Sequence, residues 1–400
     1  MHALRILREL LDHATPQMHA TRRDAVVALV SSALAGATLA VTSLGRGLDS
    51  KAYEKHRIKR ADRLMSNAHL SGERVAVYTS LARRVIAGTP RPLVSVDWSN
   101  LDDGKTRYLL RASVAVEGRA LTLYEQVHPR AEFMKAAVER QFLTRLAEVV
   151  GPACRPIVIT DAGFHNPWLK AVRALGWDFI GRVRGRVMLG DEGGDNWEQA
   201  RSLFDQAGKQ PKRLAKSSVS RANPLTCDFV IHKQNRRGRR HLNRDGRVAR
   251  AHYSREQARS QREPWLLATS LDVSTGGAIK RIVRAYKTRM QIEEAFRDLK
   301  SERFGLGFEA SRAVRVQRIE LLLLIAMLIL IVAWIIGYCV EATGLARRYQ
   351  ANTVTQYKVL STIYLGRRAW RDPSSQFRSG QLHRALDTLT QLIAKQAEDF

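Results

Sequence analysis

The feature that most constrains the fold of this chain is a run of 20 residues without a charge, 321–340, in a sequence of which 26% of the residues are charged. A helix of this length and composition can cross a lipid bilayer. A helix buried on all sides in a large protein core has the same composition. Because the run stands alone and is bounded by Glu320 and Glu341, we expect a core helix, with a membrane span as the alternative.

The net charge of +28 at pH 7 indicates a strongly electropositive surface. Such a surface is typical of a protein that neutralises many phosphates, so nucleic acid is the expected partner. Anionic lipid is the alternative partner. A second apolar stretch, 25–41, follows Arg22 and Arg23 but is interrupted by small and polar residues. We therefore expect no export signal there and a cytoplasmic protein.

The three cysteines also favour a reducing cytoplasm. Cys154, Cys227 and Cys339 lie far apart and form no C-x2-C pair. This spacing excludes a zinc ribbon and a dithiol redox site, so we expect ordinary buried thiols.

The first 88 residues have a helical pattern, with an apolar stripe formed by Leu4, Leu7, Leu10 and Leu11. Segment 53–63 carries a dense set of basic side chains: Lys55, His56, Arg57, Lys59, Arg60 and Arg63. This density suits a recognition helix that enters a DNA groove. A solvated basic helix face is the alternative.

From about residue 90 the pattern predicts an α/β fold. Strands are expected at 93–97, 107–115, 120–126, 156–160, 178–183 and 265–269 and helices at 131–150, 167–175 and 275–301. Successive strands followed by alternating helices and strands predict a mixed sheet flanked by helices.

Two further segments complete the organisation. Segment 185–263 looks like an insertion with a basic set that favours DNA contact: Lys233, Arg236, Arg237, Arg239, Arg240, Arg244, Arg247 and Arg250. A disordered basic loop is the alternative. The tail ends in an apolar stripe that is either core or a partner contact: Leu382, Ala385, Leu386, Leu389, Leu392 and Ile393.

Two aspartates follow apolar strand sequences. We expect Asp97 to end the strand Leu93-Val94-Ser95-Val96-Asp97 and Asp161 to end the strand Ile157-Val158-Ile159-Thr160-Asp161. Ligand chemistry in such sheets gathers at the carboxyl ends of strands. Two neighbouring carboxylates supply the hard oxygen ligands that Mg²⁺ prefers. Each Asp taken alone also suits a helix N-cap or a turn.

Segment 286–300 reads Y-x2-R-x3-E-x6-K, formed by Tyr286, Arg289, Glu293 and Lys300. On one continuous helix these four side chains fall within a stripe of roughly 60°. The competing acids Glu294 and Asp298 point elsewhere, so the helical phase selects Glu293 as the third carboxylate. A salt-bridged solvated helix would not explain a tyrosine and a second cation on the same line.

These motifs together resemble the DDE transposases of the insertion sequence four family. The likeness includes Val96-Asp97-Trp98-Ser99, Asp161-Ala162-Gly163-Phe164, Arg182-Val183-Arg184-Gly185, the Y-x2-R-x3-E-x6-K signature and Gln350-Ala351-Asn352-Thr353-Val354. The resemblance implies a ribonuclease-H-like core in two parts, 89–184 and 264–342, separated by a β-rich insertion, 185–263. A helical DNA-binding domain, 1–88, and a helical C-terminal region with a possible dimer contact, 343–400, complete this division.

The resemblance also implies an activity. Asp97, Asp161 and Glu293 would hold two Mg²⁺ ions, which Mn²⁺ could replace, for DNA cleavage through a hairpin and for joining of the 3′ ends to target DNA. Tyr286, Arg289 and Lys300 would bind the terminal phosphates.

The remaining expectations concern DNA contacts and assembly. Trp265 would stack a flipped base, or else serve as a core tryptophan. The partners would be double-stranded DNA and a second copy of the chain, without a membrane. A defective copy that binds DNA and represses its active relatives is the alternative function.

Overall fold

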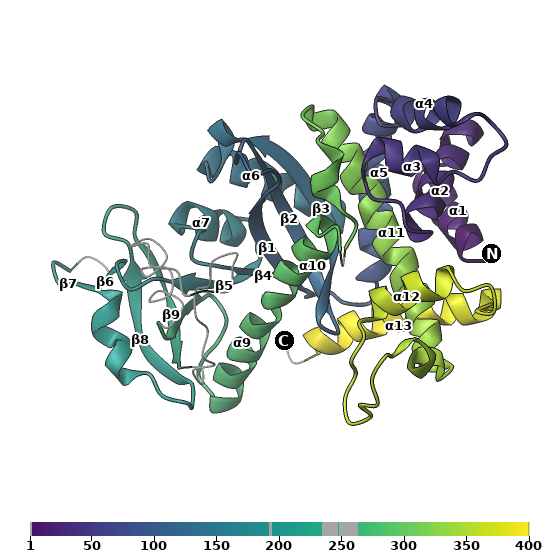
Figure 1. The fold of residues 1–400 in the computed structure, drawn as a ribbon. Helices are drawn as coiled ribbons and strands as arrows, with labels where there is room; N and C mark the ends of the chain where they lie inside the picture. Colours follow the sequence, from purple (N-terminus) through teal and green to yellow (C-terminus); the bar gives the residue numbers. More distant parts are fainter. Residues whose placement is uncertain (1, 192–193, 234–246, 248–262, 304, 399) are drawn as a thin grey trace. The chain divides into compact units, whose positions relative to one another are not determined.

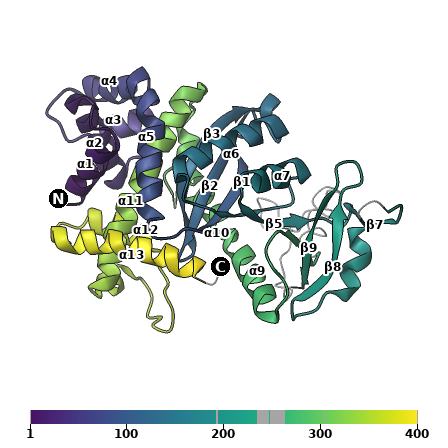
Figure 2. The ribbon, with the colours of Figure 1, turned by 180° about the vertical axis from the view of Figure 1, so that it is seen from behind.

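The computed structural model describes residues 2–191, 194–233, 247, 263–303, 305–398 and 400. The chain forms two compact units (Figures 1 and 2). Unit 1 contains Met1–Cys154 and Met290–Phe400, and unit 2 contains Arg155–Arg289. The predicted division into five domains stays a prediction.

Unit 1 begins with five helices: α1 (His2–Ala14), α2 (Ala20–Leu34), α3 (Val41–Arg46), α4 (Glu54–Leu64) and α5 (Ala68–Val85). The buried stripe of α1 includes Leu7 and Leu11 as expected, but Ile6 belongs to it while Leu4 and Leu10 lie at its margin. Helix α3 packs directly on the backbone of α4, because a Cβ on Gly45 would lie 2.5 Å from the Cα of Ile58. This close approach fixes α4, which carries the basic segment 53–63, against α3.

The apolar run is a core helix of unit 1, as expected. Helix α11 (Val316–Ala342) is long and apolar enough to cross a membrane, but 94% of its most apolar window is buried inside the protein. It lies between the N-terminal helices and α12 (Thr362–Trp370) in Figure 1. Helices α11 and α12 touch through glycines, since a Cβ on Gly366 would lie 1.7 Å from the carbonyl oxygen of Ala333.

The C-terminal stripe also belongs to the core. Helix α13 (Ser379–Ala397) packs against α1, α5, α11 and β2 within unit 1. Its buried side chains are Leu382, Ala385, Leu386, Leu389, Ile393 and Ala397. A 3₁₀ turn, Leu345–Tyr349, follows α11.

Three antiparallel strands form the sheet of unit 1 in the order β3-β2-β1. They are β1 (Leu93–Asn100), β2 (Arg107–Val116) and β3 (Arg119–Pro129). Helix α6 (Ala136–Val150) packs on β3 and begins after a 3₁₀ turn, Arg130–Glu132, so the helix predicted over 131–150 starts five residues too early. Helix α10 (Met290–Lys300) packs on all three strands.

Strand β1 is longer than predicted. It continues past Asp97, because Trp98, Ser99 and Asn100 keep pairing with β2 as far as Tyr108. The expectation that Asp97 ends its strand is therefore wrong. The polar side chains after Asp97 do not interrupt the extended backbone.

Unit 2 is built on a mixed sheet with the described strands in the order β4-β5-β10-β9-β8-β6-β7. Strands β4 (Ile157–Thr160) and β5 (Asp178–Val183) are parallel and are joined through α7 (Asn166–Ala174). The following pairs are antiparallel: β10 (Trp265–Thr269) with β5 and β9 (Leu225–His232), β9 with β8 (Lys212–Val219), and β6 (Met188–Gly190) with β8 and β7 (Trp197–Gln199). Together the two units confirm an α/β protein with sheets flanked by helices.

The segment predicted as an insertion, 185–263, thus contributes strands β6 to β9 and a 3₁₀ helix, Ala200–Gln206, to unit 2. Of the eight basic residues of this segment that were predicted to contact DNA, six lie outside the described residues: Arg236, Arg237, Arg239, Arg240, Arg244 and Arg250. Their predicted contact with DNA stays a prediction.

Candidate active site

Asp97 lies in a row of three charged side chains on one face of the unit 1 sheet. Asp97 on β1 is the register partner of Arg111 on β2, and Arg111 is the partner of Glu125 on β3. Directly opposite residues of antiparallel strands point to the same face of a sheet. Asp97 is half-buried, and its Oδ1 accepts a hydrogen bond of 2.8 Å from the backbone N–H of Trp98.

Helix α10 covers this face with its apolar side and presents two different flanks. Its buried residues are Ile292, Ala295, Phe296 and Leu299. On the flank towards β3, Gln291 accepts a hydrogen bond from the N–H of Gly118, and Arg119 pairs with Asp298 at 2.6 Å. On the flank towards β1, the Nζ of Lys300 donates to the Oγ of Ser99 at 2.9 Å.

The two adjacent glutamates of α10 lie on opposite flanks. Glu293 precedes Lys300 by seven residues, so the two side chains are separated by only about 20° around the helix. Glu293 is exposed on this β1 flank. Glu294 instead pairs with Arg119 at 3.8 Å and with Arg297. The unit 1 members of the predicted triad, Asp97 and Glu293, are therefore on β1 and on the flank of α10 that faces β1.

Burial changes the acid–base properties on both flanks. It raises the pKa of Asp298, although Arg119 opposes the shift. It lowers the pKa of Lys300, with Glu309 opposing and Arg111 adding to the shift. Both effects mark positions where a charge is costly unless a partner compensates it.

The expectation of one continuous helix over 275–301 is wrong. Helix α9 (Gly276–Thr288) ends at Thr288, and α10 begins at Met290. The N–H of Arg289 donates to the carbonyl of Tyr286, three residues earlier, whereas an α-helical N–H donates to the carbonyl four residues earlier. The hydroxyl of Thr288 donates to the carbonyl of Ala285 at 2.7 Å. The argument from a single helical stripe therefore holds within α10 only.

Asp161 belongs to unit 2 and directly follows β4. Its Oδ1 accepts a hydrogen bond of 2.8 Å from the N–H of Gly163, which orders the turn before α7. This position is compatible both with a turn residue and with a metal ligand, because the turn holds one of the two carboxylate oxygens, Oδ1.

Tyr286 and Arg289 also belong to unit 2, and both are buried, with 3% and 8% of their surfaces exposed. The Arg289 guanidinium lies 5.9 Å from the centre of the Tyr286 ring. Burial raises the pKa of Tyr286, Arg289 and Arg182 oppose the shift, and Asp161 adds to it. Tyr286 is thus in electrostatic reach of Asp161, but neither predicted phosphate contact is exposed in this structure.

Trp265 packs on Tyr286. The two rings meet edge to face with their centres 4.8 Å apart, and His232 lies on the same tryptophan at 6.0 Å. Trp265 is half-buried. The structure thus gives it both a packing partner and an exposed part, so base stacking and core packing remain the alternatives.

The three basic residues predicted on α4 differ in their environments. Arg57 donates from Nη1 to the carbonyls of Arg46 and Leu48 at 3.0 and 3.1 Å. Lys59 pairs with Asp62 at 3.3 Å, and Arg60 is exposed. Arg57 therefore holds the loop that precedes α4, a role that the density of basic residues did not indicate.

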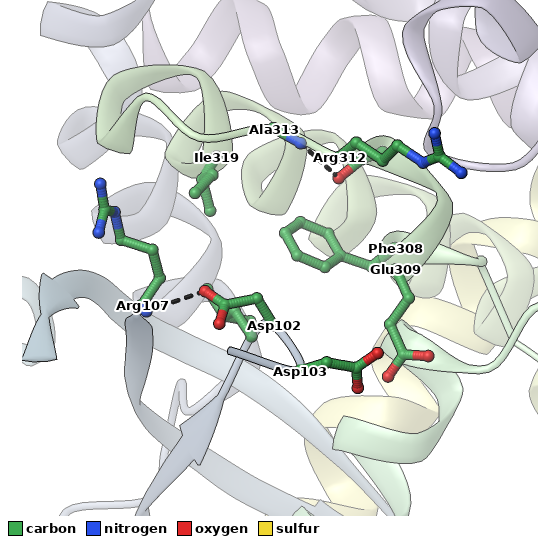
Figure 3. Close-up of a pocket in the computed structure, with 10 residues that line it drawn as sticks. Asp102, Asp103, Arg107, Phe308, Glu309, Arg312, Ala313 and Ile319 are labelled. Atoms are coloured by element: carbon green, nitrogen blue, oxygen red, sulfur yellow. Dashed lines mark hydrogen bonds between the residues drawn. The ribbon is translucent and has the colours of Figure 1, made fainter. Parts of the chain in front are cut away.

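A cavity of about 190 Å³ in unit 1 contains none of the predicted site residues (Figure 3). Asp102, Asp103, Phe308, Glu309 and Arg312 are among the residues that line it. The carboxylate of Asp102 is bound by the backbone N–H groups of Thr106 and Arg107. The lining is therefore partly a structural turn that precedes β2.

The three predicted metal ligands are divided between the units, two in unit 1 and Asp161 in unit 2. Among the described residues, no group of three or more His, Cys, Asp or Glu side chains forms a candidate metal site. The donor chemistry itself fits a hard divalent cation, because all three ligands are carboxylates. Cys154, Cys227 and Cys339 are buried free thiols, as expected.

Comparison with known proteins assigns the family. Residues 88–332, well over half of the 400-residue chain, match the family described as "Transposase DDE domain". No curated protein matches the chain significantly. The matched range begins before β1 and ends within α11, so it includes Asp97, Asp161 and Glu293. This chain belongs to the DDE transposase family.

Proposed function

We propose that this chain is a cut-and-paste transposase of the insertion sequence four family, closest in its motifs to the insertion sequence ten transposase. It would bind the terminal inverted repeats, cleave each end through a hairpin and join the 3′ ends to target DNA. The family match supports DNA cleavage. The observation that carries the choice of residues is the contrast on α10, where Glu293 lies on the β1 flank and Glu294 is paired with Arg119.

Asp97, Asp161 and Glu293 are the residues that would hold two Mg²⁺ ions, or Mn²⁺ in their place. When bound, such ions stabilise the attacking and leaving oxygens of an in-line phosphoryl displacement. Trp98 and Gly163 hold one oxygen of each aspartate through a backbone N–H. These hydrogen bonds restrict how the two carboxylates can turn.

Lys300 is proposed to bind a DNA phosphate beside the reacting bond. The hydrogen bond to Ser99 fixes its ammonium group on the β1 flank. Burial penalises this charge, so a phosphate that approaches it gains a strong electrostatic contact. Tyr286 and Arg289 are proposed to bind the same end of the DNA once their buried side chains are reached by the substrate.

Trp265 is proposed to stack a base that leaves the helix during hairpin formation. Its edge-to-face contact with Tyr286 would hold the ring in place for that purpose. Base stacking on an aromatic side chain contributes roughly 1 to 3 kcal/mol. Loss of the ring would therefore affect the hairpin step more than the first nick.

Specific end binding is proposed to depend on α4. Arg60 and Lys59 are exposed on this helix and suit phosphate contacts. Arg57 holds α4 in place by donating hydrogen bonds to the carbonyls of Arg46 and Leu48. We further propose that two copies hold two ends together, and that the protein acts in the bacterial cytoplasm on chromosomal DNA, with α11 as a core helix and no membrane contact.

The test uses a DNA duplex carrying the inverted repeats that flank the gene. Asp97→Ala, Asp161→Ala and Glu293→Ala should each abolish divalent-metal-dependent nicking and leave end binding within about two-fold of wild type. Gel-shift titration measures binding, and denaturing gels measure nicking. Near-normal cutting by any one of these variants would remove that residue from the triad, and absence of cutting by the wild type would remove the proposed activity.

A further inference from the structure

The face of the unit 1 sheet that carries Asp97 also carries a buried ion pair that the proposed reaction does not use. Arg111 and Glu125 are 2% and 1% exposed. The Nε and Nη2 atoms of Arg111 both lie 2.7 Å from Oε2 of Glu125. Fully buried charges of this kind are uncommon and need compensation from their neighbours.

Glu125 is held firmly from its other side. The hydroxyl of Tyr78 on α5 donates to Oε1 of Glu125 at 2.7 Å, and Arg74 donates to its backbone carbonyl at 3.0 Å. Arg74 also pairs with Glu320 of α11 at 3.1 Å. The position of the Arg111 guanidinium is therefore set by a network that includes two helices and strand β3.

The third nitrogen of the Arg111 guanidinium, Nη1, does not face Glu125. Because the guanidinium is planar and its Nε and Nη2 edge faces Glu125 on β3, Nη1 lies on the side away from β3. This Nη1 is buried and has no hydrogen-bond partner among the described residues. The neighbouring strand on that side is β1, where the register partner of Arg111 is Asp97.

Two observations place the charge of Arg111 beside the proposed reaction centre. The ring of Phe296 on α10 lies 5.0 Å from the guanidinium and covers it from above the sheet. Arg111 also contributes to the lowered pKa of Lys300, so its charge reaches the β1 flank of α10. The guanidinium thus lies between the sheet and α10, on the sheet face that carries its register partner Asp97.

We infer that Arg111 is a positioning residue for Asp97: the positive charge of its guanidinium, which Glu125 holds in place, orients the cross-strand carboxylate without a hydrogen bond from Nη1. The inference rests on the proposed function. A purely structural role does not require a charge at this place, because a buried ion pair can often be replaced by apolar residues of similar volume without loss of stability. The network gives Asp97 a fixed neighbour whose geometry a lysine cannot reproduce.

The experiment separates positioning from folding with a paired replacement. Arg111→Met together with Glu125→Met removes both charges, so no buried charge is left alone and the variant is expected to fold with the melting temperature of the wild type within a few degrees. It should bind end DNA like the wild type and nick it at least ten-fold more slowly. Arg119→Met together with Asp298→Met, which removes both charges of an ion pair on the opposite flank of α10, is the matched control and should nick within about two-fold of wild type.

A second measurement does not depend on cutting DNA. With Fe²⁺, ascorbate and peroxide, the polypeptide is cleaved beside a bound metal ion, and the Fe²⁺ concentration for half-maximal cleavage near Asp97 reports on metal binding. Loss of a neighbouring positive charge alone would tighten this binding. Loss of Asp97 alignment weakens it, by about ten-fold for a change of this kind.

Slow nicking together with weaker Fe²⁺ binding in the folded double variant is the expected result. A folded double variant that nicks normally, or that binds Fe²⁺ more tightly, overturns the inference. Arg111→Lys with Glu125 intact should also nick slowly, because lysine keeps the charge and loses the planar fork. If the wild type itself makes no nick, the proposed function fails, while the Fe²⁺ measurement still tests the role of Arg111.

Discussion

The two flanks of α10 carry similar polar side chains, but these side chains have different partners on the sheet. On the β3 flank, Gln291, Glu294 and Asp298 are bound by Gly118 and Arg119, so their polar groups hold the helix on the sheet. On the β1 flank, Glu293 is exposed, and the ammonium group of Lys300 donates a hydrogen bond to the hydroxyl of Ser99. The difference teaches that neighbouring acids of one helix are distinguished by what lies opposite them on the sheet, which the sequence spacing alone does not contain.

The same contrast appears on α4. Arg57 is committed to two backbone carbonyls, while Arg60 on the same helix is exposed. A basic segment therefore contains both residues that support the helix and residues available to a partner. Substitutions on α10 and α4 can test whether the exposed charged side chains serve DNA binding and cleavage while the internally bonded ones serve stability.

Apart from the proposed metal ligands themselves, the largest effect is expected at Lys300. Lys300→Met removes the cation of the β1 flank and should slow first-strand nicking by about 10² fold, the scale of a lost charge-assisted contact to a phosphate. Ser99→Ala removes only the hydrogen bond that fixes the ammonium group and should cost about five-fold. Single-turnover nicking rates measure both, and an equal loss in the two variants would contradict the separation of binding from positioning.

A smaller effect is expected on α4. Arg60→Ala should weaken end binding and reduce the dependence of log K on log salt by about one, without a change in melting temperature. Arg57→Ala should lower the melting temperature, because two carbonyls before α4 lose their donor. Gel shifts over a salt series and thermal unfolding give the two readouts. A reduced salt slope with unchanged stability in Arg57→Ala would show that this arginine contacts DNA after all.

The smallest effect is expected at Asp298 on the β3 flank. Burial raises its pKa in the folded protein, so the folded state binds this proton more readily than the unfolded state. Above the ordinary pKa of an aspartate, the loss of this proton costs free energy in the folded state, so the free energy of unfolding falls as pH rises. At lower pH Asp298 is protonated in both states and this cost is absent. Asp298→Asn should therefore melt slightly higher than the wild type at pH 7 and show a shrinking difference as pH falls towards 4. A difference that grows on acidification would contradict the direction of the shift.

Much of the secondary structure follows from local sequence. The strands Asp178–Val183 and Trp265–Thr269 have the predicted bounds, and the 20-residue apolar run is a buried core helix. These elements are predictable because apolar runs with clear flanking turn residues leave few alternatives. The break at Arg289 was not predictable, because neither glycine nor proline occurs in segment 286–292 and the break is visible only in the backbone hydrogen bond from Arg289 to Tyr286.

The role of Arg111 shows why the site could be predicted only in part. An arginine with apolar neighbours in the middle of strand 107–116 is a signal of a buried charge. Counting back from the turn at Glu117 and Gly118, however, would pair Arg111 with Tyr124 and place Glu125 on the opposite face. A β-bulge between Ala112 and Ser113 shifts the register by one residue and brings Arg111 opposite Glu125. Such a shift reverses which side chains share a face, and nothing in the local sequence requires it.

The central claim is that the β1 flank of α10 supplies the third carboxylate. The direct measurement compares Glu293→Gln with Glu294→Gln in first-strand nicking under single-turnover conditions, at equal end binding. The two changes are chemically identical and one residue apart. We predict that Glu293→Gln lowers the rate by at least 10³ fold, on the scale of losing an essential catalytic group, and that Glu294→Gln stays within about three-fold of wild type. Comparable losses in the two variants, or a larger loss at Glu294, would contradict the account.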